Sequence, residues 1–177
     1  MISILAYVAL AFLALRTLVI MVNFLHSRFA LNDHVKPAPL DLSILIPCRN
    51  EENNIGRLLS LLQGLDDQPR EIIVCDDQST DRTFEIVSGF TSRYKHMRCI
   101  RNDSLPEGYT GKNWACEQLA KQAKGKYMLF IDADLTLGGN ILGNLVSFMK
   151  KKRLDLLSVF PMQQMLSALN SGGQQLA

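Results

Sequence analysis

Two aspartates flank an alanine at Asp132-Ala133-Asp134, directly after the apolar run KYMLFI at 126–131. In extended backbone, residues two apart point to the same side, so both carboxylates would face one crevice. Such a pair repels unless a cation lies near it. Hard oxygen ligands of this kind suit Mg²⁺ or Mn²⁺, which would also hold phosphate oxygens. The alternative interpretation is an acidic turn after a strand, where aspartate is common in any case.

A second acidic pair, Asp76-Asp77, follows the apolar run REIIVC at 70–75. An acidic residue at the end of such a strand can accept hydrogen bonds from a ribose hydroxyl or a base N–H. The following residues also fit the start of a helix, with Ser79 or Thr80 as the N-cap and Asp81 in the first turn. Both interpretations can hold together, with one aspartate facing a ligand and the other residues serving the helix.

Lys112 stands in the stretch Gly111-Lys112-Asn113-Trp114, where a polar loop gives way to a helical pattern. A lysine at a helix start could reach a diphosphate, helped by the N-terminus of the helix. The alternative is a solvated lysine beside a buried tryptophan. No GxGxxG follows the first apolar run, which argues against a dinucleotide cofactor, and the sequence has no GxxxxGK[ST] phosphate loop.

Apolar runs alternating with helical patterns must position these residues. Strands are predicted over 42–47, 70–75, 97–100, 126–131 and 154–160, and helices over 51–63, 79–93, 112–124 and 140–151. Asn50 is the expected N-cap of the first helix, and Gly125 is expected to close the third. The alternation predicts an α/β fold with a mostly parallel sheet flanked by helices. Because ligands bind beyond the carboxyl ends of such strands, the polar stretches at 47–52, 76–81 and 132–134 should form one site.

The amino-terminal segment, residues 1–25, is apolar and is interrupted mainly by Arg16 and Asn23. A membrane-spanning helix needs about 20 mostly apolar residues. A central arginine costs about 2.5–3.5 kcal/mol on insertion scales, which the flanking apolar side chains can outweigh. We therefore expect a transmembrane or anchoring helix. The alternatives are a cleaved signal peptide, an amphipathic helix lying on the membrane and a buried core helix.

Charge and cysteine content narrow the function classes. The formal net charge is +2 and there is no basic stripe with interleaved aromatics, so a nucleic-acid partner is not expected. The cysteines form no CxxC pair, which argues against zinc and favours small buried side chains in a reducing compartment. Arg28 and Lys36 follow the apolar segment and no basic residue precedes it, so the positive-inside bias places the rest of the chain in the cytoplasm.

Four stretches, in chain order, resemble the family 2 glycosyltransferases with the GT-A fold: ILIPCRNEENNI, IIVCDDQSTDRT, GYTGKNWACEQLA and YMLFIDADL. The resemblance covers about residues 41–160. The amino-terminal segment and GKNWA look like the membrane-bound enzymes that glycosylate carotenoid-type or hopanoid-type lipids. The resemblance implies transfer of a sugar from a nucleoside-diphosphate sugar, with a UDP-sugar favoured, to a membrane lipid at the cytoplasmic face of the cell membrane. It also implies a Mg²⁺ or Mn²⁺ cofactor.

The resemblance assigns roles by position. The metal would be held by Asp132 and Asp134, with Asp134 the direct ligand, and Asp77 would contact the base. The family's catalytic carboxylate has no counterpart, because Asp155 is the only acidic residue after Asp134 and lies among strand-like residues. The candidate donor-binding residues are Pro47, Asn50, Glu51, Asp76, Asp77, Lys112 and Asp132.

The expected organisation is an anchor helix over 1–25, a linker over 26–40, a nucleotide-sugar-binding GT-A domain over 41–160 and a tail over 161–177, where a truncation is expected. Three alternatives remain open. One is a truncated module that binds nucleotide and metal without turnover. Another is a nucleotidyltransferase, which would carry a Gly-rich loop where Cys48-Arg49-Asn50 stands. The last is a structural α/β protein without a ligand, against which the three polar strand ends argue.

Overall fold

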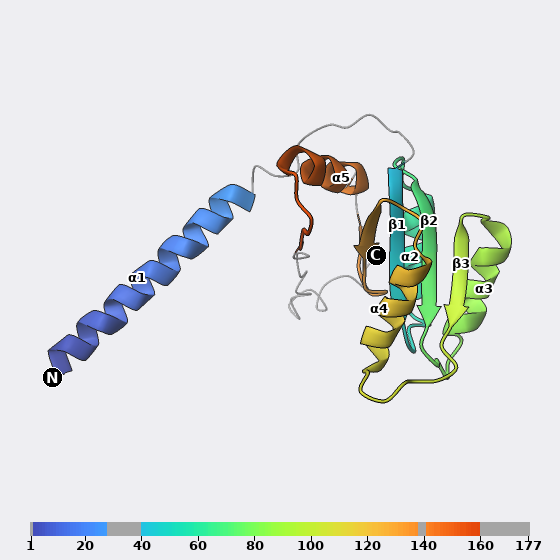
Figure 1. Ribbon diagram of the computed structural model, residues 1–177, viewed down its shortest axis with the longest axis horizontal. Helices are drawn as coiled ribbons and strands as arrows, with labels where there is room; N and C mark the ends of the chain where they lie inside the picture. The colour runs from blue at the N-terminus through green and yellow to red at the C-terminus, as the bar shows by residue number, and fades with distance from the viewer. Residues whose placement is uncertain (1, 28–39, 138–140, 160–177) are drawn as a thin grey trace, which may run out of the picture.

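The computed structural model describes residues 2–27, 40–137 and 141–159. Four parallel strands form one sheet in the order β3-β2-β1-β4. The strands are β1 (Leu40–Cys48), β2 (Pro69–Asp76), β3 (Met97–Arg101) and β4 (Tyr127–Phe130). The helices are α1 (Ile2–Ser27), α2 (Ile55–Gln63), α3 (Thr83–Arg93), α4 (Gly111–Gln122) and α5 (Ile141–Lys152). The predicted parallel α/β sheet with flanking helices is thus confirmed (Figure 1).

Helices cover both faces of the sheet. Alternate residues of a strand point to opposite faces, so Ile44 and Ile46 of β1 pack with α2, α3 and α5, whereas Leu45 packs with α4. In α2 the buried positions are Ile55, Leu58, Leu59 and Leu62, the spacing of one helix face. With both faces covered, the central strands β1 and β2 each contain a continuous apolar run, ILI at 44–46 and IIVC at 72–75. Each fully buried Leu or Ile stabilises the fold by about 1.5–3 kcal/mol.

The first predicted helix begins later than expected. It starts at Ile55 rather than at residue 51, and Asn54 is the residue before it. Asn50 is not an N-cap: its φ is 55°, in the left-handed region that asparagine tolerates, and its Oδ1 accepts a hydrogen bond of 2.8 Å from the backbone N of Thr80. The asparagine therefore joins the loop after β1 to the loop after β2.

The prediction that Ser79 or Thr80 caps the second helix is also wrong. This helix, α3, begins at Thr83, and Asp81 accepts the hydrogen bond from the backbone N of Thr83 at 2.9 Å. Ser79 Oγ instead accepts from the backbone N of Asn50 at 3.0 Å. The side chains expected to cap the helix are used to hold the two loops together.

Gly125 does not close the third predicted helix, because α4 ends at Gln122 and Ala123 is its C-cap. The backbone N of Gly125 donates to Ser43 Oγ at 2.8 Å, and a Cβ at position 125 would lie 2.5 Å from the Ser43 backbone N. A glycine is needed here because the chain passes directly over the start of β1.

The predicted strand over 154–160 is wrong for its described part. Residues 154–159 form no strand in the structure, and Leu156 is 84% exposed. An apolar run becomes a strand only where a neighbouring strand offers its backbone, which the sequence does not reveal. Residue 160 and the predicted tail at 161–177 lie outside the described residues. So does most of the predicted linker, whose ends belong to α1 and β1.

The amino-terminal helix α1 is the one described helix long and apolar enough to cross a membrane. Its window Ala6–Phe24 has a mean hydropathy of 2.0 and none of it is buried. Arg16 lies near the middle of this window, with its guanidinium carbon 5.9 Å from the centre of the Phe12 ring. The helix therefore adds nothing to the sheet's core.

Candidate functional site

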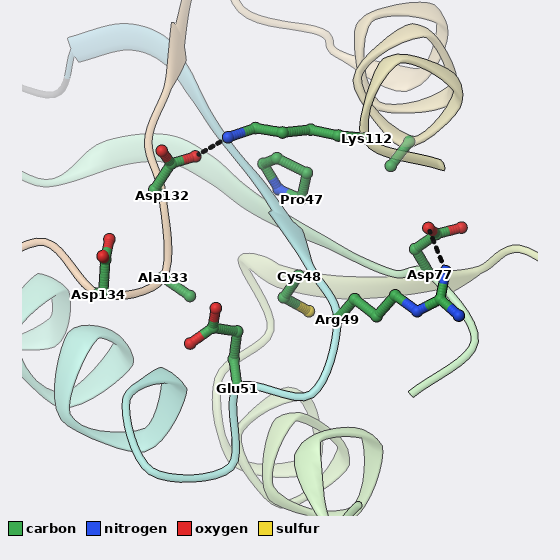
Figure 2. A pocket seen from close by; sticks show the side chains of 10 residues that line it. Pro47, Cys48, Arg49, Glu51, Asp77, Lys112, Asp132, Ala133 and Asp134 are labelled. Carbon is green, nitrogen blue, oxygen red and sulfur yellow. Dashed lines mark hydrogen bonds and ion pairs between the residues drawn. The ribbon is translucent and has the colours of Figure 1, made fainter. Parts of the chain in front are cut away.

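A pocket of about 250 Å³ lies at the carboxyl ends of the strands, beside the start of α4 (Figure 2). The polar strand ends predicted to converge do so here. Six of the eight predicted site residues line the pocket: Pro47, Glu51, Asp77, Lys112, Asp132 and Asp134. Asn50 and Asp76 lie outside the lining.

The loop after β1 is held by side chains of the loop after β2 and of the first residue of α3. The backbone N of Glu51 donates to Thr83 Oγ1 at 2.8 Å, and the backbone N of Glu52 donates to Asp81 Oδ2 at 3.1 Å. In the reverse direction, Glu52 Oε2 accepts a hydrogen bond from the backbone N of Arg82 at 3.1 Å. These bonds fix the backbone of Glu51, whose carboxylate enters the pocket (Figure 2).

The adjacent Asp76 and Asp77 have different surroundings. Asp76 is fully buried, accepts from the backbone N of Ser79 at 3.3 Å, and has Oδ2 3.3 Å from Arg101 Nε without hydrogen-bond alignment. Asp77 is 5% exposed and lines the pocket. Asp76 therefore fixes the end of β2, while Asp77 is the member of the pair that can meet a ligand.

Two further residues hold Asp77. Asn102 Nδ2 donates to Asp77 Oδ1 at 3.4 Å, and Arg49 Nη1 lies 3.8 Å from Asp77 Oδ2. Neither residue is among the predicted site residues. Their positions in the sequence could have identified them as site residues. Arg49 belongs to the polar stretch after β1, and Asn102 directly follows β3, so each is a polar residue at the carboxyl end of a strand.

Lys112 extends from the first turn of α4 across the pocket, and its Nζ lies 2.8 Å from Asp132 Oδ1 (Figure 2). This hydrogen bond raises the pKa of Lys112 above its usual value, so the ammonium is charged. The turn itself is fixed by Thr110, the N-cap, whose side chain accepts from the backbone N of Asn113 at 3.4 Å. The backbone of Lys112 is thus held, while its long side chain reaches a second element.

The aspartate pair reaches the pocket from a turn, not from extended backbone as expected. β4 ends at Phe130, and the backbone N of Leu135 donates to the Asp132 carbonyl at 3.3 Å. Ala133 is buried between the two exposed aspartates. Both carboxylates nevertheless line the same pocket, as the spacing predicted.

The pocket offers two adjacent carboxylates to a metal ion, and the described residues contain no group of three or more His, Cys, Asp or Glu side chains placed to hold one. Mg²⁺ is commonly held by one or two carboxylates together with substrate phosphates. Asp132 and Asp134 therefore fit a metal that arrives with a phosphate group better than a metal bound by protein alone.

Cys48 lines the pocket as a neutral group, because burial raises the pKa of its thiol well above the usual range. Cys48 and Cys75 are buried, Cys99 is partly buried, and all are free thiols, as predicted. Asp155 lies away from the pocket, in an apolar groove beside β4 and α5 that includes Tyr127 and Met149.

A family model described as "Glycosyl transferase family 2" matches residues 43–166. The chain is 31% identical over 119 residues to a poly(ribitol-phosphate) beta-glucosyltransferase of Bacillus spizizenii, covering 66% of this chain and 18% of the relative. It is 32% identical to a 4,4'-diaponeurosporenoate glycosyltransferase of Staphylococcus haemolyticus, covering 68% of this chain and 32% of the relative. The matched part of the chain thus corresponds to less than a third of the length of either protein.

Solved structures agree in fold. Residues 1–349 of S. aureus TarS in complex with UDP-GlcNAc match with a TM-score of 0.51 and 28% identity, covering 63% of this chain and 32% of that one. A mannosyltransferase from Pyrobaculum calidifontis, in complex with GDP-Man and Mn²⁺, matches with a TM-score of 0.54 and 21% identity, covering 73% and 39%. By the family match, which covers most of its length, the chain belongs to glycosyl transferase family 2.

Proposed function

We propose that this chain forms the donor-binding part of a membrane-attached, metal-dependent glycosyltransferase. It would bind a nucleoside-diphosphate sugar, with a UDP-sugar favoured, and supply the sugar to a lipid hydroxyl at the cytoplasmic face of the membrane. The observation that carries the proposal is one pocket containing two cationic side chains and two adjacent aspartates at the carboxyl edge of the sheet. TarS in complex with UDP-GlcNAc supports the choice of nucleotide.

The pocket residues divide into two groups by position. On one side, Asp77 is oriented by Asn102 and Arg49 and can accept a hydrogen bond from a base N–H or a ribose hydroxyl. On the other side, Lys112 can pair with a diphosphate at the start of α4. Asn50 would act by fixing the loop after β1, and Asp76 by fixing the end of β2.

Asp132 and Asp134 would hold Mg²⁺ or Mn²⁺ together with the diphosphate oxygens. The bound metal would neutralise the charge that develops on the leaving diphosphate. Lys112 would add positive charge to the same region, so the metal and the ammonium would both stabilise the leaving group. A base for the acceptor hydroxyl is not assigned, because Asp155 lies in the apolar groove away from the pocket.

A lipid acceptor is supported by two observations. The helix α1 has the length and hydropathy of a membrane span. Relatives include a beta-monoglucosyldiacylglycerol synthase of Nostoc and the diaponeurosporenoate glycosyltransferase described above. Binding of nucleotide and metal without turnover is a second candidate function, favoured by the position of Asp155 in the apolar groove away from the pocket.

Titration calorimetry of the full chain in detergent tests the proposal. UDP, GDP and NAD⁺ are titrated with and without Mn²⁺, using the wild type and the Asp134→Ala variant. We expect UDP to bind only with Mn²⁺, NAD⁺ not to bind, and Asp134→Ala to abolish the Mn²⁺-dependent binding. Equal UDP binding by the wild type and the variant would show that the metal assignment is wrong. No binding of either nucleoside diphosphate would overturn the donor site itself.

A further inference from the structure

The ion pair between Lys112 and Asp132 spans the pocket and consists of two side chains that are mostly in solvent. Nζ lies 2.8 Å from Oδ1, while the two side chains are 65% and 56% exposed. Pairs between exposed groups are weak and exchange partners readily. The contact is therefore one that a stronger ligand in the pocket can replace.

The backbone around Lys112 is fixed and cannot shift when Lys112 exchanges Asp132 for another partner. Gly111 is in contact with Asp77, where an added Cβ would overlap the carboxylate, and Thr110 caps the helix. Asp77 is almost completely buried. Any change of partner must then occur through rotation of the Lys112 side chain, which has four rotatable carbon–carbon bonds and a compact charge.

Simultaneous binding of the Lys112 ammonium and a metal ion by the Asp132 carboxylate is unfavourable. A magnesium ion binds carboxylate oxygen at about 2.0–2.1 Å, so an ammonium and a divalent ion on the same oxygen would lie within about 5 Å of each other. Their mutual repulsion disfavours simultaneous binding. Asp134 alone would leave the ion with a single protein carboxylate from the pair.

We infer that Lys112 changes partner during donor binding. When the nucleotide and the metal enter together, the Lys112 ammonium moves from Asp132 to the diphosphate. This inference rests on the proposed donor site and adds an order to it. While the pocket is empty, Lys112 protects Asp132 from free divalent ions. When a diphosphate is present, the ammonium has a more strongly charged partner, and Asp132 becomes available to the metal.

The exchange couples the two ligands. The diphosphate attracts Lys112 and so frees Asp132, which raises metal affinity, and by linkage the metal raises nucleotide affinity by the same factor. Lys112 is then a positioning residue for the metal as well as a contact for the donor. If Lys112 only contacted the diphosphate, its presence would leave the affinity for free metal unchanged or only slightly lowered, and replacing it would change that affinity little.

The test is a titration of free Mn²⁺, followed by electron paramagnetic resonance, on the full chain in detergent without nucleotide. We compare the wild type with Lys112→Met, Lys112→Gln and Lys112→Arg. Lys121→Met is the matched control, because Lys121 lies on the same helix in a 2.6 Å ion pair with Glu117 away from the pocket. We expect Lys112→Met and Lys112→Gln to bind free Mn²⁺ about three- to fivefold more tightly, with the Arg variant and the control within twofold of wild type.

A second titration, of UDP at saturating Mn²⁺, separates the outcomes. We expect Lys112→Met to bind UDP at least about tenfold more weakly, so that the two affinities move in opposite directions. If free Mn²⁺ binds Lys112→Met and Lys112→Gln as it binds the wild type, the exchange is overturned and the donor site stands on its own binding data. If the wild type binds no nucleoside diphosphate, the donor site fails, and the free Mn²⁺ comparison still decides whether Lys112 competes for Asp132.

Discussion

The carboxylate of Asp77 lies directly against Gly111, where a methyl group would overlap Oδ2 and stand 3.3 Å from Cγ. The contact joins the end of β2 to the first residue of α4. It places a negative charge at the positive end of the helix, which is a favourable arrangement. The glycine in the GKNWA stretch thus has a packing reason that is independent of the neighbouring lysine.

The Gly111→Ala substitution should therefore displace Asp77. We expect a loss of about 1–3 kcal/mol of stability from overpacking. We also expect UDP binding to weaken about tenfold, because Asp77 would leave the position from which it is proposed to contact the base. Thermal unfolding and UDP titration in the presence of Mn²⁺ measure the two effects. In an Asp77→Ala background the methyl group has room, so the stability loss should nearly disappear. An equal loss in both backgrounds would contradict the contact.

A second glycine lies at the opposite end of the sheet. At Gly125 a Cβ would lie 2.5 Å from the Ser43 backbone N and 2.8 Å from the Leu42 carbonyl carbon, atoms that belong to the buried strand β1. Gly125→Ala should cost about 3 kcal/mol. Gly89, in α3, has no atom within 4 Å of an added Cβ, so Gly89→Ala should stabilise by about 0.5–1 kcal/mol.

Urea unfolding followed by the fluorescence of Trp114, the only tryptophan, measures both changes. Trp114 packs edge-on against Tyr109 with ring centres 5.1 Å apart, so its emission reports on α4. Opposite signs for the two alanine substitutions are the expected result. A Gly125→Ala variant as stable as the wild type would show that the chain at 125 can move away from β1.

Glu71 makes stability dependent on pH. Burial alone would raise the pKa of this carboxyl, but hydrogen bonds from Arg98, Ser43 and the backbone N of Lys124 outweigh it and hold the pKa below its ordinary 4.5. The stabilisation is therefore fully present above pH 4.5 and is lost as the pH falls through the lowered value of the folded state. Urea midpoints between pH 7 and pH 3 should fall accordingly.

The Glu71→Gln variant removes this titration. It should be less stable than the wild type at pH 7, and the two should approach each other at low pH as the wild-type carboxyl gains its proton. Glu117→Gln is the control, because Glu117 pairs with Lys121 on the exposed face of α4. Parallel pH curves for Glu71→Gln and the wild type would show that Glu71 does not carry the effect.

The amino end of α5 depends on a buried carboxylate. Asp67 is 2% exposed and its Oδ2 accepts from the backbone N of Gly143 at 3.2 Å. Asp67→Ala should cost about 1–2 kcal/mol, because it leaves a buried N–H without a partner. The neighbouring Asp66 is exposed, so Asp66→Ala should change the urea midpoint little. Equal midpoints for both variants would argue against a capping role for Asp67.

The sequence predicts the order of strands and helices well, because strands buried on both faces contain uninterrupted apolar runs such as ILI at 44–46. The convergence of the polar strand ends follows from the parallel topology. Helix starts are predicted less well. Asn50 and Ser79 satisfy local capping rules, but each bonds to the other's loop about thirty residues away, a tertiary contact with no local signal.

The roles of Asp76 and Asp77 illustrate the same limit at the site. Both follow the same apolar run, and the sequence supports a ligand contact by either. Which one faces the pocket depends on where the strand ends, and β2 includes Asp76. Asp76 thereby points to Arg101 of the neighbouring β3, while Asp77 lies beyond the strand against Gly111. The difference of one residue separates a buried structural group from a candidate ligand contact.

Among the described strands, β4 is at an edge and pairs with β1 through only four residue pairs, Tyr127 to Phe130. Asp77 follows the interior strand β2, whereas Asp132 and Asp134 follow this short edge strand. Local opening is easiest where backbone pairing is least, so the amides of β4 should exchange with solvent hydrogen faster than those of β2. The closed state of the pocket side formed after β4 is then shorter-lived than that of the side formed after β2. A divalent ion held by the aspartate pair would slow exchange in β4 and leave exchange in β2 as it was.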